Sequence, residues 1–140
     1  MNSEERKLLV KDLSGRVQSH VRLQVKGCKT ECLHDLDGVH GEAVNVTHYE
    51  LTEDNKKRLL YIDNWVVVDD VKPYLRPLES MTGEEYEEYS HLWELQQEYC
   101  TDADIQFKID LFDWLNEHHF DYRNLIEKGL VLPAPEGMYK

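Results

Sequence analysis

Four side chains between residues 28 and 40 are of the types that bind zinc in proteins. They are Cys28, Cys32, His34 and His40. Zinc takes thiolate sulfur and imidazole nitrogen as ligands in a tetrahedron, and four such groups in one short stretch could supply a complete set. Paired zinc-binding cysteines usually have two residues between them, however, and here there are three. We therefore interpret these residues as the best metal candidates in a polar loop, and we predict no metal and no cofactor.

A second group of residues with chemical potential lies in the C-terminal half. Glu88 and His91 have the Glu-x-x-His spacing of di-iron sites on helices, but such sites need a second copy of the motif, which the sequence lacks. His118 and His119 follow several carboxylates, and such groups perform acid–base chemistry only where burial separates their pKa values. The sequence also has no nucleophile elbow, phosphate-binding loop or dinucleotide fingerprint. We predict no catalytic residue, and an enzyme with a dispersed site is the third functional hypothesis.

Basic and aromatic residues intermix between positions 56 and 76, and they give the second functional hypothesis. They are Lys56, Lys57, Arg58, Tyr61, Trp65, Lys72, Tyr74 and Arg76. A small barrel with such a patch could bind single-stranded nucleic acid by stacking bases on the rings and placing cations against the phosphates. The acidic remainder of the chain would repel phosphates, so nucleic acid is the alternative partner and not the expected one.

The negative charge of the chain is concentrated in its second half. Residues 1–76 carry 12 Lys and Arg against 13 Asp and Glu, whereas residues 77–140 carry 4 against 15. The leading hypothesis is therefore a non-enzymatic interaction protein that presents an acidic helical face to a protein with a basic surface. Electrostatic complementarity of this kind raises association rate and specificity. The predicted partner-binding residues are Glu84, Glu85, Glu87, Glu88, Asp110, Asp113 and Glu117.

Apolar residues alternate before the segment 72–82, as they do in strands, and recur with a helical period after it. A short helix is predicted over residues 3–13, with Ser3 as its N-cap. Four strands are predicted at Arg16–Lys26, Ala43–Leu51, Arg58–Ile62 and Trp65–Val68, with a polar excursion over 28–42 and a hairpin at Asp63-Asn64. Four short strands of this kind favour a small bent antiparallel sheet or an SH3-like barrel.

The second half is predicted to contain two or three helices. Pro73 and Pro77 favour a stiff extended connector over 71–81, and Thr82 with Glu85 can form a capping box. The apolar stripe of the first helix comprises Tyr86, Tyr89, Trp93, Gln96 and Cys100, and that of a second helix after Asp102 comprises Ile105, Ile109, Phe112 and Leu115. A third short helix is predicted between Asp121 and Gly129, followed by an extended tail at 131–140.

These elements define the predicted organisation. The fold class is α+β, in one domain over residues 1–140, with a β-rich half at 1–70, a proline-containing connector at 71–81 and an acidic helical half with a tail at 82–140. No apolar run is long enough for a membrane span, and an odd count of three cysteines fits a reducing compartment. We therefore expect a cytoplasmic protein.

Two blocks of sequence resemble a known family. The first is Lys72-Pro73-Tyr74-Leu75-Arg76-Pro77 followed by Ser80-Met81-Thr82, and the second is His119-Phe120-Asp121-Tyr122-Arg123 followed by residues 125–130, LIEKGL. Together they are similar to a family of uncharacterised small proteins encoded by gut-bacterial genomes and their phages. The resemblance covers roughly the second half of the chain. It implies a cytoplasmic protein of a prophage or mobile element, and it implies no activity and no site residue.

Overall fold

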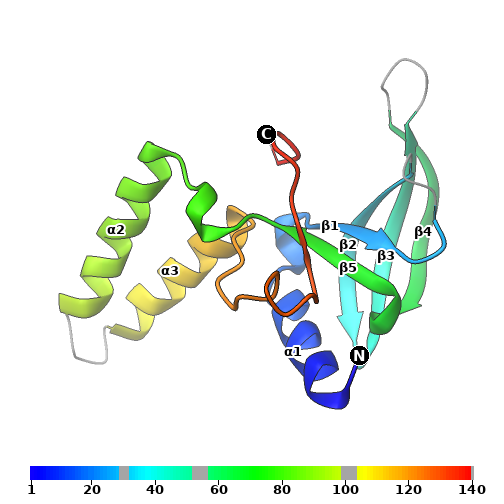
Figure 1. The fold of residues 1–140 in the computed structure, drawn as a ribbon, viewed down its shortest axis with the longest axis horizontal. Helices are drawn as coiled ribbons and strands as arrows, with labels where there is room; N and C mark the ends of the chain where they lie inside the picture. Colours follow the sequence, from blue (N-terminus) through cyan, green and yellow to red (C-terminus); the bar gives the residue numbers. More distant parts are fainter. Residues whose placement is uncertain (29–31, 52–56, 99–103, 140) are drawn as a thin grey trace.

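The computed structural model describes residues 1–28, 32–51, 57–98 and 104–139. Helix α1 (Ser3–Ser14) and the 3₁₀ turn η1 (Val17–Ser19) precede strands β1 (Arg22–Val25), β2 (Cys32–His40), β3 (Ala43–Leu51) and β4 (Lys57–Val67). Then follow η2 (Val68–Asp70), β5 (Val71–Leu75), η3 (Leu78–Ser80), α2 (Gly83–Glu98), α3 (Asp104–Glu117) and the two-residue strand β6 (Leu132–Pro133). Figure 1 shows α2 and α3 side by side at one end of the molecule and β2–β4 at the other, with α1 between them.

The strands form one open sheet in the order β4-β3-β2-β1-β5-β6. Strands β1 to β5 pair antiparallel with their neighbours, and β6 runs parallel to β5. The predicted α+β class is confirmed. Within the described ranges the sheet has six strands, where about four were predicted, and its order is that of an open sheet.

Strand β2 occupies a segment that the sequence indicated to be a polar excursion over 28–42. Asp37 and Gly38 resemble a turn, but the pairing of β2 with β3 shifts its register between Leu36 and Gly38. A bulge of this kind absorbs an extra residue without ending the strand. The prediction of a polar excursion was therefore wrong over residues 32–40, because residues that are typical of turns also occur at bulges within a strand.

The predicted hairpin at Asp63-Asn64 is also wrong. The residues on both sides of it belong to the single strand β4, which pairs with β3 from Lys57 to Val67, with register shifts around Tyr61. By contrast, β3 has the predicted bounds, Ala43–Leu51. The first predicted strand is shorter than expected, because η1 and the left-handed backbone of His20 (φ 53°) precede β1.

Strand β5 lies within the segment predicted to be a connector. Leu23, Gln24 and Val25 of β1 pair with Pro73, Lys72 and Val71. Pairing with β6 begins at Tyr74, so Pro73 lies where β5 is still an edge strand, the setting in which a sheet tolerates proline. The extended conformation expected from the prolines is present, and β5 carries the chain from the sheet to η3 and α2 (Figure 1).

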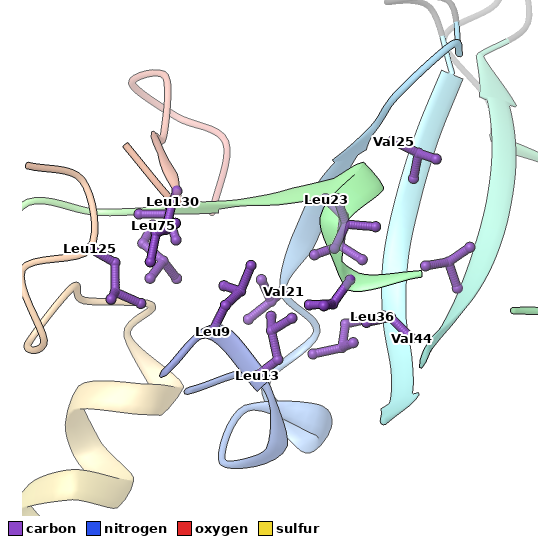
Figure 2. Close-up of a cluster of buried hydrophobic side chains, with 14 residues drawn as sticks. Leu9, Leu13, Val21, Leu23, Val25, Leu36, Val44, Leu75, Leu125 and Leu130 are labelled. Carbon is purple, nitrogen blue, oxygen red and sulfur yellow. The ribbon is translucent and has the colours of Figure 1, made fainter. Parts of the chain in front are cut away.

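The main hydrophobic core lies between α1, the sheet and the C-terminal segment. Figure 2 shows Leu9 and Leu13 of α1 near Val21 and Leu36, with Leu75 and Leu125 farther along the same cluster. Leu9 and Leu13 are fully buried, as the short N-terminal helix predicts. That helix begins with Asn2 as its N-cap and not Ser3, because the Asn2 side chain accepts from the backbone N–H of Glu5 and the Glu5 carboxylate accepts from that of Asn2.

A smaller core joins α2 and α3. Leu111, Leu115 and Phe120 are buried in it, and Met81, Tyr89, Leu92, Trp114 and Tyr122 pack around them. The predicted capping box at the start of α2 is confirmed, since the Glu85 N–H donates to the Thr82 hydroxyl and the Thr82 N–H donates to the Glu85 carboxylate. The predicted third helix is absent from residues 121–129, which form turns instead. Asp121 holds these turns by accepting from the backbone N–H groups of Leu125 and Ile126.

A buried ion pair ties α1 to the C-terminal segment. The fully buried Asp12 carboxylate accepts from Arg16 at 2.8 and 3.2 Å and from the partly exposed Arg123 at 3.2 Å. Arg16 Nη2 also donates to the backbone oxygen of Phe120 at 2.7 Å. Both members of the pair need each other, because a single buried charge without a partner is strongly destabilising.

Removing Asp12 tests this pair. We expect Asp12→Ala to lower the free energy of unfolding by about 3 to 5 kcal/mol, because Arg16 would remain buried without its counter-charge. Urea denaturation followed by circular dichroism would measure the change. Asp69→Ala is the control, since it removes the solvent-accessible partner of Arg6 and should have a far smaller effect. Equal losses in the two variants would contradict the structural role of the buried pair.

Candidate functional site

Arg76 lies where the sheet joins the α2–α3 hairpin. Its guanidinium donates to both carboxylate oxygens of Glu85 at 2.7 Å, and it lies 4.3 Å from the centroid of the Phe120 ring. Its backbone N–H donates to the oxygen of His119, and its carbonyl accepts from the N–H of Asp121. The hydrogen bond from Arg76 is the main reason why the pKa of Glu85 is lowered to about 2. Arg76 therefore fixes the start of α2 against the sheet and is fully engaged inside the protein.

Three clefts surround the segment Pro77–Gly83. The first, which we call the α2 cleft, has a volume of about 410 Å³ and is lined by Leu78, Glu79, Met81, Thr82, Gly83, Tyr86 and Tyr89. The second, the turn cleft, has about 390 Å³ and is lined by Pro77, Leu78, Glu79, Asp121, Tyr122, Asn124, Ile126 and Glu127. The third, the tail cleft, has about 640 Å³ and lies between residues 76–85 and the C-terminal residues 133–139. Leu78 and Glu79 are shared by the first two clefts.

The C-terminal tail is held by Tyr139. Its hydroxyl donates to the backbone oxygen of Tyr74 at 2.6 Å and accepts from the N–H of Arg22 at 3.0 Å. Its ring stacks on His119 with centroids 3.7 Å apart, and His119 Nε2 donates to the backbone oxygen of Ser19. Burial raises the pKa of Tyr139 to about 12. The tail that we expected to be merely extended is thus anchored at the sheet edge.

The predicted partner-binding carboxylates are in different environments. Glu85 is paired with Arg76, Glu88 accepts from the indole N–H of Trp114, and Asp110 accepts from Gln106. Glu84, Glu87, Asp113 and Glu117 are exposed, and in the described part of the chain none of them is in an ion pair. Glu94, which the sequence analysis did not single out, is exposed on α2 in the same way. Four of the seven predicted carboxylates are therefore exposed without an ion pair in the described structure, and Glu94 joins them.

Large apolar side chains are exposed on both helices of the hairpin, which the sequence analysis did not expect. Tyr86 is 62% exposed, and Trp93, Ile109 and Phe112 are each 46% exposed. The predicted stripe on α2 was half wrong, because Tyr89 and Leu92 pack against α3 while Tyr86 and Trp93 face outward. The sequence analysis treated every apolar residue of a stripe as buried, and it therefore did not identify this exposed surface. The width of the apolar stripes could have indicated this exposed surface, because it exceeds what two helices can bury against each other.

The three metal candidates whose side chains are described do not form a cluster. Cys28 is exposed, His34 is buried and stacked on His48 with ring centroids 4.2 Å apart, and His40 is exposed beside Trp65. The side chain of Cys32 lies outside the described residues. No group of three or more His, Cys, Asp or Glu side chains that could hold a metal occurs in the part of the chain that is described.

The basic–aromatic patch is divided across the sheet. Trp65 lies on β4, whereas Lys72 and Tyr74 lie on β5, and strands β3, β2 and β1 separate the two. Along the chain, however, β4 and β5 are joined directly by the three-residue turn η2, so their adjoining ends lie close together. Arg76 is occupied by Glu85, and Lys56 and the side chains of Lys57, Arg58 and Tyr61 lie outside the described residues. Of the described members of this set, Arg76 is thus engaged inside the protein.

The two histidines that could have contributed to a dispersed catalytic site face different neighbours. His118 Nδ1 donates to the backbone oxygen of Trp114, and its ring stacks on the indole of that residue with centroids 4.2 Å apart. His119 is held between Ser19 and Tyr139. Neither residue lines the α2, turn or tail cleft. The described geometry does not gather them with carboxylates around one cavity.

Comparisons of the chain with protein-family models, with curated proteins and with solved structures give no match. None of the helices formed by the described residues has the length and apolar composition needed to cross a membrane. The function is therefore inferred from the surface of this molecule and from its sequence.

The Arg76–Glu85 pair leads to a stability prediction. We expect Glu85→Gln to lower the free energy of unfolding by about 1 to 3 kcal/mol, between the values for exposed and fully buried ion pairs. Glu84→Gln is a matched control, because it removes the same charge from the same helical turn at an exposed position. Urea denaturation of both variants would measure the difference. A loss in Glu84→Gln as large as that in Glu85→Gln would mean that the helix dipole, and not the ion pair, is responsible.

Two histidines predict a dependence of stability on pH. Burial lowers the pKa of His34 to about 4, with a contribution from His48, and burial is also the main reason why the pKa of His119 is about 4. Because the folded protein favours the neutral rings, their contribution to the free energy of unfolding is complete above about pH 6.5 and is lost as the pH falls towards 4. Glu85 titrates below this window.

Urea denaturation at pH 7 and pH 5 would test the histidine effect. We expect the wild-type protein to be less stable at pH 5, and His34→Leu to show a smaller difference between the two pH values. His91→Gln replaces an exposed histidine on α2 and should keep the wild-type difference. An unchanged difference in His34→Leu would show that the buried ring does not contribute.

Proposed function

We propose that this protein is a non-enzymatic interaction protein whose acidic α2–α3 hairpin binds a protein partner that has a basic surface. The observation that carries the proposal is the combination of exposed, unpaired carboxylates with exposed aromatic side chains on the same two helices. Cysteine usage supports a cytoplasmic location, and the resemblance of residues 72–82 and 119–130 supports an accessory role in a prophage or mobile element.

The charge of the hairpin supports a basic partner. The residues of α2 and α3 include ten Asp and Glu and a single lysine, Lys108. Three of these acids, Glu85, Glu88 and Asp110, have partners within the protein, whereas Glu84, Glu87, Glu94, Asp113 and Glu117 are exposed. Such a surface raises the local concentration of cationic groups and accelerates their association. The same field opposes nucleic acid, whose phosphates would meet like charge.

The exposed aromatic residues add the apolar contact that charge alone does not supply. On α2, Tyr86 and Trp93 are seven residues apart and therefore lie on the same side of the helix. Aromatic residues are enriched among the side chains that contribute most to protein–protein binding. Glu87 and Glu94 have the same seven-residue spacing one position further along, so an acidic row accompanies the aromatic row. This pattern fits a partner whose surface is both basic and apolar.

The proposal is tested with a defined probe. A fluorescein-labelled helical peptide of about 14 lysine and leucine residues, arranged with one basic and one apolar face, would be titrated with the protein and followed by anisotropy. We expect binding that weakens steeply between about 20 and 300 mM salt, since exposed charges are screened over a Debye length of about 10 Å at 0.1 M.

Charge variants separate the hairpin from the overall charge of the protein. Glu87→Gln combined with Glu94→Gln should weaken binding at low salt about fivefold or more, by removing two charges from the proposed surface. Glu4→Gln combined with Glu42→Gln makes the same change in net charge at exposed positions outside the hairpin and should leave binding within about twofold. Binding that is insensitive to salt, or equal effects of the two pairs of changes, would refute the proposal.

A further inference from the structure

The α2 cleft is an apolar hollow next to the acidic face. Its lining consists mostly of Leu78, Met81, Tyr86 and Tyr89, with Gly83 at the first position of α2. Leu78 is 37% exposed and Tyr86 is 62% exposed, so the rim of the cleft is accessible. A volume of about 410 Å³ falls in the range of sites that bind ligands, which are typically apolar with a few polar groups. The cleft is therefore large enough to receive a bulky side chain.

The walls of the α2 cleft are held in place by contacts already described. The capping box between Thr82 and Glu85 orders the start of α2, and Arg76 holds Glu85 from the sheet side. Tyr89 lies between the rings of Trp93 and Trp114, with centroids 6.4 and 6.1 Å away. A cavity with fixed walls binds more tightly, because less conformational entropy is lost when it is occupied.

The turn cleft lies beyond Leu78 and Glu79 and has a different character. Glu79, Asp121 and Glu127 are among its lining residues, and no Lys or Arg is. Both Asp121 oxygens accept backbone N–H groups, and Glu127 accepts from Asn124. Glu79 is exposed and is in no ion pair within the described part of the chain. An apolar hollow and an acidic hollow thus lie on the two sides of one short segment.

We propose that these two clefts together bind one amphipathic basic segment of the partner. An apolar side chain of that segment fills the α2 cleft, and a neighbouring lysine or arginine side chain binds Glu79 in the turn cleft. This inference rests on the proposed function and names the chemistry of its partner. The charge of the surroundings favours a basic occupant. Glu79 is shared by both clefts, and Glu84 and Glu87 follow on α2. Neither cleft is lined by a cationic side chain that would hold an acidic or phosphate-bearing ligand.

Filling the α2 cleft tests the proposal. A Cβ added at Gly83 meets no atom within 4 Å, and its backbone is not in the left-handed region, so Gly83→Leu adds a bulky side chain at the lining of the α2 cleft without strain. Ser3→Leu is a matched control, because Ser3 is the first residue of α1 and also follows an N-cap in a capping box. Gly83→Leu also favours the helix, since glycine is the poorer helix former. Circular dichroism would confirm that both variants are folded.

Two peptides of equal charge distinguish this inference from the proposed function. The lysine–leucine peptide would be compared with a lysine–alanine peptide of the same length and number of lysines. We expect Gly83→Leu to weaken binding of the lysine–leucine peptide about tenfold and to change binding of the lysine–alanine peptide less than about twofold. Ser3→Leu should change neither. A second variant, Tyr86→Ala, removes an exposed wall of the cleft. It should also weaken binding of the lysine–leucine peptide more than binding of the lysine–alanine peptide.

Each outcome has one meaning. If both peptides bind equally and Gly83→Leu has no effect, the cleft inference is refuted while the proposed acidic interaction remains. If neither peptide binds with a dependence on salt, the proposed function itself fails. Glu79→Gln tests the turn cleft separately. It should weaken binding of the lysine–leucine peptide more than Glu42→Gln does, and equal effects would refute the placement of the cationic side chain.

Discussion

Two arginines from distant parts of the chain bind the same buried residue, Phe120. Arg16 donates to its carbonyl oxygen, and the guanidinium of Arg76 lies over its ring. A positive charge placed at a core must be compensated, and each arginine has its own carboxylate, Asp12 from α1 and Glu85 from α2. Because Phe120 also belongs to the core with Leu111 and Leu115, this arrangement connects the sheet, α1 and the α2–α3 hairpin through one residue.

This constraint also determines which acidic residues remain for other molecules. Carboxylates that neutralise arginines or accept hydrogen bonds inside the protein have a structural role, and the low pKa of Glu85 reflects it. Glu84, Glu87, Glu94, Asp113 and Glu117 are in no ion pair within the described structure, and they are exposed on the same two helices as several aromatic rings. The negative charge of the second half is thus divided between holding the hairpin against the sheet and forming the surface that we propose to bind a partner.

Two blocks of the sequence, residues 72–82 and residues 119–130, are close in space. Arg76 at the end of the first block pairs with Phe120 in the second, and the α2 and turn clefts lie beside this contact. Residues from both blocks line the turn cleft, including Pro77, Asp121 and Tyr122. The two blocks therefore share a structural role, since their contact positions the start of α2. The proposed binding region lies next to this contact.

The sequence alone determined the features that depend on neighbouring residues. The change from alternation to helical period predicted the α+β class, and β3, the capping box at Thr82 and the charge of the hairpin followed from local chemistry. The bulge in β2 and the continuity of β4 did not follow, because a bulge and a turn use the same residues and differ only in pairing with β3. The environments of Arg76, Glu85, Tyr86 and Trp93 were decided by tertiary structure alone. Pairing and exposure depend on where β5 and residues 118–121 bring the helices, and no local pattern encodes the contacts of Arg76 with residues 118–121, which are more than forty positions away.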